Sequence, residues 1–232
     1  MINPNFNEMV DTALIRISKF IRKTPLQHSK TLSALSDSEV YLKLENYQVT
    51  GSFKARGATN KLMLLSEQSP QKIITASSGN HGSAVAFASA KLNLDVLIFL
   101  PETVSLAKLN KIKSYGAEVK ISGHDSGDAE LAAKKYAESK NYPYLSPYND
   151  LDVITGQGTA AAEVCQDIAR LDAVFIAVGG GGLISGMGGY LKQKIPKIQV
   201  VACSPENSSA MDHALSVGRI EQIEHSETLS DG

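Results

Sequence analysis

The sequence predicts an α/β protein built on parallel β-sheets that carry helices on both faces. Short apolar runs alternate with helical patterns along most of the 232-residue chain. Runs such as DVLIFL and AVFIAV are apolar at every position, which is typical of strands buried on both faces. The connections between them are short, so successive strands should lie parallel, with a helix as each crossover.

Each expected element follows from a local pattern. Residues 1–66 predict helices near 6–21 and from 53 to 66, with an apolar strand at 40–44. Residues 67–145 predict strands at 72–76, 95–100 and 117–121, alternating with helices at 80–92, 106–115 and 128–139. After the turn-rich segment 145–150, which we interpret as a return between domains, helices are expected at 158–169, 183–191 and 208–217, with strands at 173–178 and 198–203. The last fifteen residues, GRIEQIEHSETLSDG, are polar and complete no further unit.

Composition argues against several function classes. Hydrophobic residues make up 43% of the chain and the net charge is −1, so neither nucleic acid nor an anionic membrane is an expected partner. No run is long enough to span a membrane, and the N-terminus lacks the apolar centre of a signal peptide. We therefore expect a cytoplasmic protein in which Cys165 and Cys203 are buried, reduced thiols.

Lys54 stands where a turn containing Gly51 leads into a helix. The positive end of the helix dipole disfavours the ammonium form of a lysine at that place. Because only the neutral amine attacks a carbonyl, such a lysine suits amine chemistry. From this segment alone, a surface lysine without a role is the favoured interpretation.

The hexapeptide SSGNHG, residues 77–82, lies where a predicted strand turns into a helix. In doubly wound sheets ligands bind beyond the carboxyl ends of the strands, and free amides at a helix N-terminus suit a carboxylate or phosphate. A serine or asparagine that merely caps the helix is the alternative interpretation.

Four consecutive glycines, residues 179–182, follow a buried strand and precede a helix. Several of their amides can converge on one phosphate, whereas close packing explains one glycine more readily than four. Gly180-x-Gly182-x-x-Ser185 only approximates a dinucleotide fingerprint, and no acid for a ribose ends the next strand. No Gly-Lys-Ser/Thr follows, so a Walker loop is excluded. The sequence thus predicts a phosphate site rather than an NAD site.

Together, a helix-start lysine, a carboxylate-sized anion site and a phosphate cradle suit pyridoxal 5′-phosphate bound as a lysine Schiff base. The sequence resembles the serine/threonine dehydratase and serine racemase family, the fold-type II pyridoxal-phosphate enzymes of the tryptophan synthase beta-like superfamily. GSFKARGA (51–58) is similar to the cofactor-lysine motif of that family, SSGNHG to its substrate loop and GGGGLISG (179–186) to its phosphate loop. PYND and GQGT are similar as well, and the motifs follow the family order over essentially the whole chain. The corresponding cysteine synthase motifs are absent.

The resemblance implies a role for each motif. Lys54 would bind the cofactor and take the substrate Cα proton, with Ser78 as a second acid or base on the opposite face of the cofactor. The cofactor-binding residues would be Phe53, Lys54, Asn80, Gly179, Gly180, Gly181, Gly182 and Leu183. The substrate carboxylate would lie against Ser77, Ser78, Gly79, Asn80 and His81, the last as a structural group rather than a base.

The implied fold has two doubly wound parallel-sheet domains with the active site in the cleft between them. A large cofactor domain would comprise residues 1–66 and 146–232, and a small α/β domain residues 67–145. The implied activity is that of a threonine or serine ammonia-lyase, which converts L-threonine or L-serine to a 2-oxo acid and ammonia, in a homodimer. Since serine racemases of the family carry a serine at the position of Ser78, a serine racemase with dehydratase side activity is the alternative.

Two departures from the family pattern stand out. Ser204 and Ala210 replace the acids of the family's divalent-metal site, so no metal is expected. The family also continues well past the position of Gly232, into a part that supplies a serine or threonine facing the pyridine nitrogen. We therefore expect a chain shortened at the C-terminus, either a fragment or an altered member, which could be a non-catalytic cofactor-binding remnant.

Overall fold

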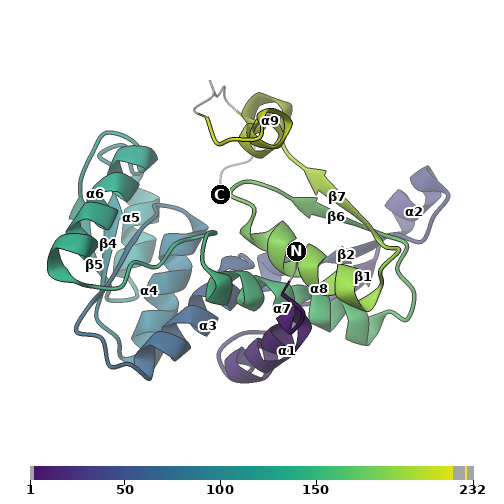
Figure 1. Ribbon diagram of the computed structural model, residues 1–232, viewed down its shortest axis with the longest axis horizontal. Helices are drawn as coiled ribbons and strands as arrows, with labels where there is room; N and C mark the ends of the chain where they lie inside the picture. Colours follow the sequence, from purple (N-terminus) through teal and green to yellow (C-terminus); the bar gives the residue numbers. More distant parts are fainter. Residues whose placement is uncertain (1–2, 222–227, 229–232) are drawn as a thin grey trace.

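The computed structural model describes residues 3–221 and residue 228. Most of the polar terminal segment 218–232 lies outside these residues. Two groups of elements lie side by side in Figure 1, with helices α3 (Lys54–Ser66) and α7 (Leu151–Asp167) between them. None of the helices within the described residues combines the length and the hydropathy that a membrane crossing requires.

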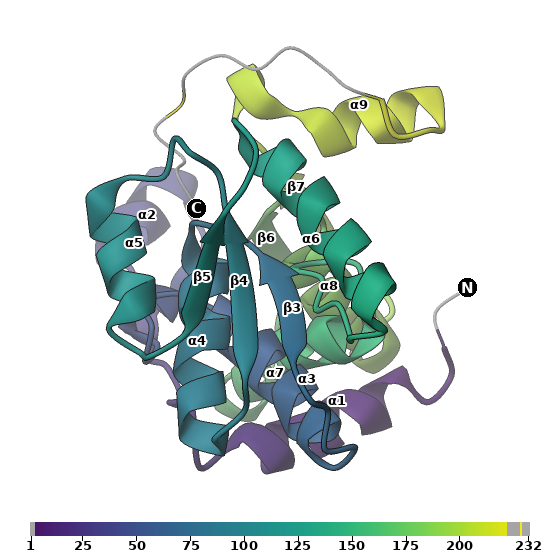
Figure 2. The ribbon, with the colours of Figure 1, turned by 90° about the vertical axis from the view of Figure 1, so that its left-hand side faces the viewer.

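The first group is a three-stranded parallel sheet in the order β3 (Ile73–Ala76), β4 (Val96–Leu100) and β5 (Glu118–Ile121). Helices α4 (Asn80–Leu92) and α5 (Leu106–Lys113) lie on one face and α6 (Ser126–Lys140) on the other (Figure 2). Ile73 and Ile98 pack with α4, whereas Ile74 and Phe99 pack with Ala133 of α6. Every residue of β3 and β4 is buried, so these strands confirm the predicted two-sided burial.

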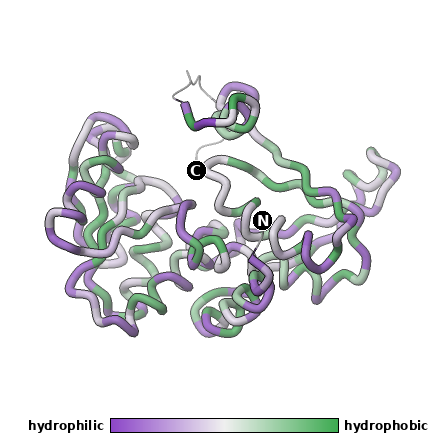
Figure 3. The backbone as a smooth tube through the Cα atoms, viewed as in Figure 1, coloured by the Kyte–Doolittle hydropathy of each residue, from purple (hydrophilic) through white to green (hydrophobic). Residues whose placement is uncertain are grey.

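The second group is a two-stranded parallel sheet of β6 (Ala173–Ala177) and β7 (Gln199–Cys203), joined by α8 (Gly182–Lys194). On one face, Ile176 is 2% exposed in a core shared with α8, α7 and α1 (Phe6–Ile17). On the other face, Phe175 is 72% exposed. The hydrophobic colour of both strands is plain in Figure 3.

Two predictions for this sheet are therefore wrong. Within residues 3–221 and 228, the sheet is not covered on both faces. Cys203 is exposed rather than buried, and Cys165 of α7 is half-buried. Successive residues of a strand point to opposite faces, and the helices of the described residues pack on only one of them. An apolar run shows that a strand can be buried on both faces, but not that covering elements are present.

The predicted strand at 40–44 is β2 (Tyr41–Lys43), but it pairs antiparallel with β1 (Leu26–His28), against the expectation of parallel pairing throughout. Neither β1 nor the intervening helix α2 (Lys30–Ser36) is predicted from the sequence. β1 is three residues long, and α2 buries no side chain, so neither carries an apolar pattern that could be recognised. The remaining described elements are two 3₁₀ turns, Glu45–Tyr47 and Glu206–Ser208, and α9 (Ala210–Val217).

Helix α7 begins at Leu151, well before the predicted start at 158. The side chain of Asp150 caps it by accepting hydrogen bonds from the amides of Asp152 and Val153 at 2.8 and 3.2 Å. Two glycines in its first half obscured the helical pattern. One of them, Gly156, lies so near α3 that an added Cβ would come within 2.6 Å of the Gly57 Cα. The backbones of α3 and α7 are therefore in direct contact.

Candidate active site

The segment 143–150 brings the three predicted motifs together. The amide of Leu145 donates to the carbonyl of Ile74 at 2.8 Å, so the segment runs alongside β3 of the three-stranded sheet. Next along the chain, the Pro147 carbonyl accepts a hydrogen bond from Lys54 Nζ at 3.0 Å. Tyr148 then packs against Gly180. The sequence indicates this segment only as a return between domains, whereas the structure makes it a wall of the site.

Lys54 is the first residue of α3, and its amide donates to Ser52 Oγ at 3.2 Å. Its Nζ lies 5.4 Å from the centre of the Phe53 ring. Burial lowers the pKa of Lys54 to about 8, in the direction that the sequence predicts. The expected cause was the helix dipole, whereas the structure attributes the lowered pKa to desolvation of the ammonium group.

The SSGNHG segment forms the turn between β3 and α4. Gly79 is the N-cap of α4 and provides no side-chain hydrogen bond, so no side chain of the N-cap residue satisfies the first amides of this helix. A Cβ on Gly82 would lie 2.0 Å from the Ser77 carbonyl oxygen, so only glycine allows the turn to fold onto the helix. Ser77, Ser78 and Gly79 line a cavity of about 320 Å³, together with Pro147. The structure thus puts part of the predicted carboxylate loop beside the carbonyl that binds Lys54.

His81 is a structural residue of the first turn of α4. It is 2% exposed, and its Nε2 lies 3.2 Å from Thr75 Oγ1. Since Thr75 Oγ1 itself donates to the Leu145 carbonyl at 2.7 Å, it accepts from His81, and Nε2 carries the proton. Burial, helped by the nearby Lys54, lowers the pKa of His81 to about 3. The imidazole is therefore neutral and withdrawn from solvent, which does not suit a general base.

Three of the four consecutive glycines have structural reasons of their own. A Cβ on Gly180 would lie 2.5 Å from Tyr148 Cδ1, and one on Gly182 would lie 3.1 Å from Tyr148 Cα. Gly181 has a φ of 84°, which favours glycine. Only at Gly179 would a side chain meet nothing within 4 Å. Packing thus explains more of this loop than the sequence predicts.

The loop nevertheless fits an anion. Its last glycine opens α8, and the N-cap Gly181 offers no side-chain hydrogen bond to the first amides of that helix. Two helix N-termini without side-chain caps, α4 and α8, thus accompany one half-buried lysine whose pKa is lowered. These groups suit a ligand that combines a phosphate with an aldehyde.

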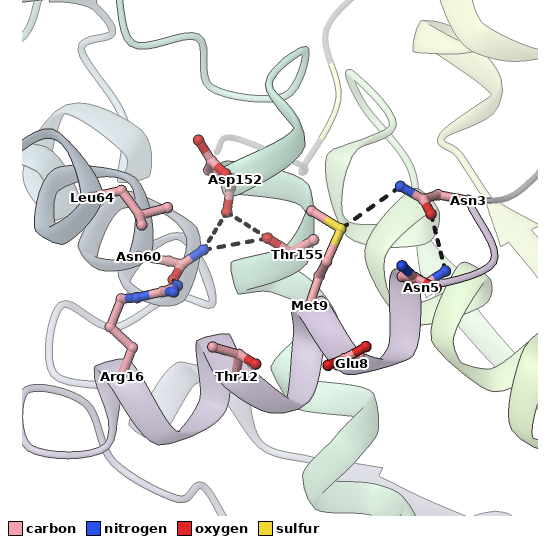
Figure 4. A pocket seen from close by; sticks show the side chains of 10 residues that line it. All are labelled: Asn3, Asn5, Glu8, Met9, Thr12, Arg16, Asn60, Leu64, Asp152 and Thr155. Atoms are coloured by element: carbon pink, nitrogen blue, oxygen red, sulfur yellow. Dashed lines mark hydrogen bonds between the residues drawn. The ribbon is translucent and has the colours of Figure 1, made fainter.

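A larger cavity, of about 380 Å³, lies between α1, α3 and α7 (Figure 4). Asn60 lines this cavity and links the three helices, because its Oδ1 accepts from Arg16 Nη1 at 2.5 Å and its Nδ2 donates to the Asp152 carbonyl at 2.7 Å. None of the predicted site residues lines this cavity, so we place the candidate site at the smaller one. Within residues 3–221 and 228, no three His, Cys, Asp or Glu side chains gather as a metal site would require.

Two residues that the sequence does not single out join α3 to the rest of the site. Arg56 is fully buried and binds Glu45 and Glu163, with Nη1 2.7 Å from Glu163 Oε1. Gln157 accepts from the amide of Gly57 at 3.2 Å. Both residues stand inside the motifs GSFKARGA and GQGT, so the motifs are recognisable from the sequence but these contacts are not.

Comparison with known proteins identifies the family of the chain. The family model described as pyridoxal-phosphate dependent enzyme matches residues 17–232. The chain is 37% identical over 226 residues to the L-threonine ammonia-lyase of Thermotoga maritima, and the alignment covers 97% of this chain and 56% of that protein. It is 40% identical over 225 residues to the catabolic L-threonine dehydratase TdcB of Staphylococcus aureus, with 96% and 65% covered. The chain thus spans 56% of the length of the first of these curated relatives and 65% of the length of the second.

Among solved structures, serine racemase from Dictyostelium discoideum superposes with a TM-score of 0.86 at 37% identity, covering 93% of this chain and 71% of that one. The processed form of threonine deaminase isoform 2 from Solanum lycopersicum superposes with a TM-score of 0.89 at 30% identity, covering 97% and 66%. These similarities confirm the predicted fold class.

Proposed function

Because the chain belongs to the pyridoxal-phosphate dependent enzyme family, we propose that it acts as a threonine or serine ammonia-lyase. The reaction converts L-threonine or L-serine to a 2-oxo acid and ammonia. The observation that carries the proposal is the half-buried amine of Lys54, bound to the Pro147 carbonyl on the wall of the cavity that Ser78 also lines. The names of the two threonine-cleaving relatives support this substrate class.

In the proposed reaction Lys54 holds the cofactor through its side-chain nitrogen and, when the substrate amine has replaced it, accepts the proton of the substrate Cα. When bound, pyridoxal phosphate supplies an electron sink for the pair left on that carbon. The uncapped amides of α8 and the glycine loop hold the phosphate. Those at the start of α4 hold the substrate carboxylate, beside Ser78 and Asn80.

The balance of the reaction requires no external oxidant or reductant. Lys54 takes the Cα proton, the β-hydroxyl group leaves as water, and a second water replaces the nitrogen. The two waters cancel, so that one hydroxy amino acid gives one 2-oxo acid and one ammonia. The chain's own contribution is to orient the Cα–H bond toward Lys54 and to shield the amine from solvent.

The test begins with cofactor binding. We expect the purified protein, incubated with pyridoxal phosphate and reduced with borohydride, to carry the cofactor on the peptide that contains Lys54, and Lys54→Ala to abolish this adduct. Formation of 2-oxo acid from L-threonine and L-serine then tests the activity. An adduct without turnover would identify a cofactor-binding remnant, and no adduct on Lys54 would refute the central assignment.

Ser78 supports a second candidate, serine racemase with dehydratase side activity. Its position on the cavity wall suits a second acid or base, and solved serine racemases share the fold. Chiral analysis of serine after incubation separates the two functions. Racemisation that is lost selectively in Ser78→Ala supports the racemase, and enantiopure serine alongside 2-oxo acid formation rules it out.

The domain organisation and the assembly state belong to the same proposal. We propose a large domain of residues 1–66 and 146–232, a small domain of residues 67–145 and a cytoplasmic homodimer. The separate sheets of the two groups of elements support the division. Light scattering on the purified protein measures the assembly state, and a monomer at all concentrations would contradict the dimer.

A further inference from the structure

The first turn of α3 is capped by a residue from a distant part of the chain. The amides of Lys54 and Ala55 donate to Ser52, at its Oγ and its carbonyl oxygen. The amide of Gly57, however, donates to Gln157 Oε1 at 3.2 Å. Gln157 lies on α7, so the beginning of the helix that carries Lys54 is held by a side chain 100 residues away.

The side chain of Gln157 packs against α3 on the face of the helix that carries Lys54. Residues three apart in a helix are neighbours on one face, so Gly57 lies next to Lys54. A Cβ on Gly57 would come within 2.4 Å of Gln157 Nε2. Because Gly57 has no side chain, the amide of Gln157 fits beside the first turn of the helix.

Only the oxygen of the Gln157 side-chain amide makes a hydrogen bond. Gln157 is 1% exposed, and its Nε2 has no hydrogen-bond partner in the part of the chain that the structure describes. A buried donor without a partner is unfavourable. A glutamate would accept the same hydrogen bond without leaving a donor over, but it would place a negative charge in the first turn of α3.

The ionisable groups around this turn are already engaged or neutral. On α4, His81 is neutral. Tyr148, in the segment before α7, has a raised pKa because of burial and so keeps its proton. Among the charged side chains near this turn, Arg56 pairs with Glu45 and Glu163, Lys61 with Asp150 and Asp152, and Lys43 with Glu163. Arg16 donates to Asn60, and Lys111 of α5 donates to the Thr50 carbonyl in the loop before α3. A carboxylate at position 157 would thus be a new, unpaired charge.

We propose that Gln157 is a positioning residue for Lys54, which caps the first turn of α3 with a neutral amide and so keeps negative charge away from the reacting amine. The inference deepens the proposed function and rests on it only in taking Lys54 as that amine. A residue that only accepts the hydrogen bond of the Gly57 amide would have no effect on the titration of Lys54, so the two roles make different predictions for Lys54 in Gln157→Glu.

The test compares Gln157→Glu with Gln157→Met in the protein without cofactor. Labelling with fluorodinitrobenzene over a pH series, measured by peptide mass spectrometry, follows the free amine of Lys54, and the exposed Lys30 serves as internal reference. In Gln157→Glu we expect the labelling of Lys54 at neutral pH to fall about tenfold, which corresponds to about one pKa unit. The thermal midpoint should fall as well, because the carboxylate is buried without a cationic partner.

Gln157→Met removes the acceptor without adding charge, so we expect a lower thermal midpoint with the Lys54 titration shifted far less than in Gln157→Glu. The inference is overturned if Lys54 in Gln157→Glu is labelled at the wild-type rate, or if both variants lower the rate equally. Borohydride trapping of pyridoxal phosphate by the wild-type protein is a separate measurement. Its failure would refute the proposed function and leave the labelling result standing.

Discussion

At the scale of single residues, burial prepares Lys54 for amine chemistry. The side chain is half-buried, and desolvation lowers its pKa to about 8 from the usual value of 10.5. Its Nζ donates to the Pro147 carbonyl, an acceptor that either protonation state can use. The lysine therefore has a sizeable neutral fraction near neutral pH without an adjacent base.

This pKa predicts the pH dependence of cofactor capture. Since only the neutral amine reacts, the rate at which Lys54 reacts with pyridoxal phosphate should rise as the pH increases through about 8 and level off above it. Stopped-flow absorbance at a fixed cofactor concentration measures this rate. A rise that continues to the pH range of an exposed lysine would contradict the effect of burial.

The glycine loop offers a matched pair of substitutions. Gly180→Ala should lower both the thermal midpoint and the affinity for pyridoxal phosphate, because its Cβ would lie 2.5 Å from the Tyr148 ring. Gly179→Ala meets no neighbour within 4 Å and should leave the midpoint unchanged while it weakens cofactor binding. Fluorescence titration and thermal unfolding together make the comparison. Unchanged affinity in Gly179→Ala would mean that this residue does not face the phosphate.

At the scale of elements, the contact between α3 and α7 positions the site. Gly57 and Gly156 let the two backbones touch, and the side chain of Arg56 on α3 binds Glu163 on α7. The Arg56 guanidinium binds Glu163 of α7 and Glu45 of the 3₁₀ turn, so it joins three separate segments. A buried ion pair contributes little net stability, because the cost of desolvating both charges offsets their attraction. Removing one partner, however, leaves an uncompensated buried charge and is strongly destabilising.

Replacing Arg56 by methionine should therefore be severe. We expect a loss of about 3–5 kcal/mol of unfolding free energy, because Glu163 would stay buried with only Lys43 as a cationic partner. Urea unfolding followed by circular dichroism measures the change. Arg170→Met is the control: that side chain is 85% exposed in its pair with Asp172, and a change within about 0.5 kcal/mol is expected. Equal effects of the two substitutions would show that the buried network is unimportant.

At the scale of the whole molecule, the two sheets differ in how they are covered. Helices bury β3 and β4 of the three-stranded sheet on both faces, whereas β6 exposes Phe175 on one face of the two-stranded sheet. Phe175 pairs in register with Val201, and Ala177 with Cys203, so the exposed face is apolar at these two pairs. An uncovered apolar sheet face favours association.

Two neighbouring residues of β6 test whether this face is uncovered in solution. Ile176→Ala should cost about 2–5 kcal/mol of unfolding free energy, because Ile176 is 2% exposed in the core. Phe175→Ala should change the unfolding free energy by no more than about 0.5 kcal/mol at low protein concentration. A large cost for Phe175→Ala that grows with protein concentration would reveal a second copy covering the face.

Much of the fold and part of the site could be predicted from local patterns. The strands at 72–76 and 95–100 and the helix at 80–92 are nearly where the apolar periodicity places them. The strand β1, with its antiparallel pairing to β2, and the early start of α7 could not be found in this way. The strand β1 has too few apolar residues. The start of α7 depends on the cap at Asp150 and on Gly156, which lies inside a helix because it packs directly against the backbone of α3.

The sequence by itself determined the chemical groups of the candidate site: a lysine at the start of one helix, and two turns at the carboxyl ends of strands whose amides suit anions. These depend on residue type and on neighbours within a few positions, which local patterns report. The tertiary structure decided how they meet, through Pro147 beside Lys54, Tyr148 against Gly180 and Gln157 at the first turn of α3. These contacts join segments that are distant in the sequence, and side-chain packing selects them only when the chain has folded.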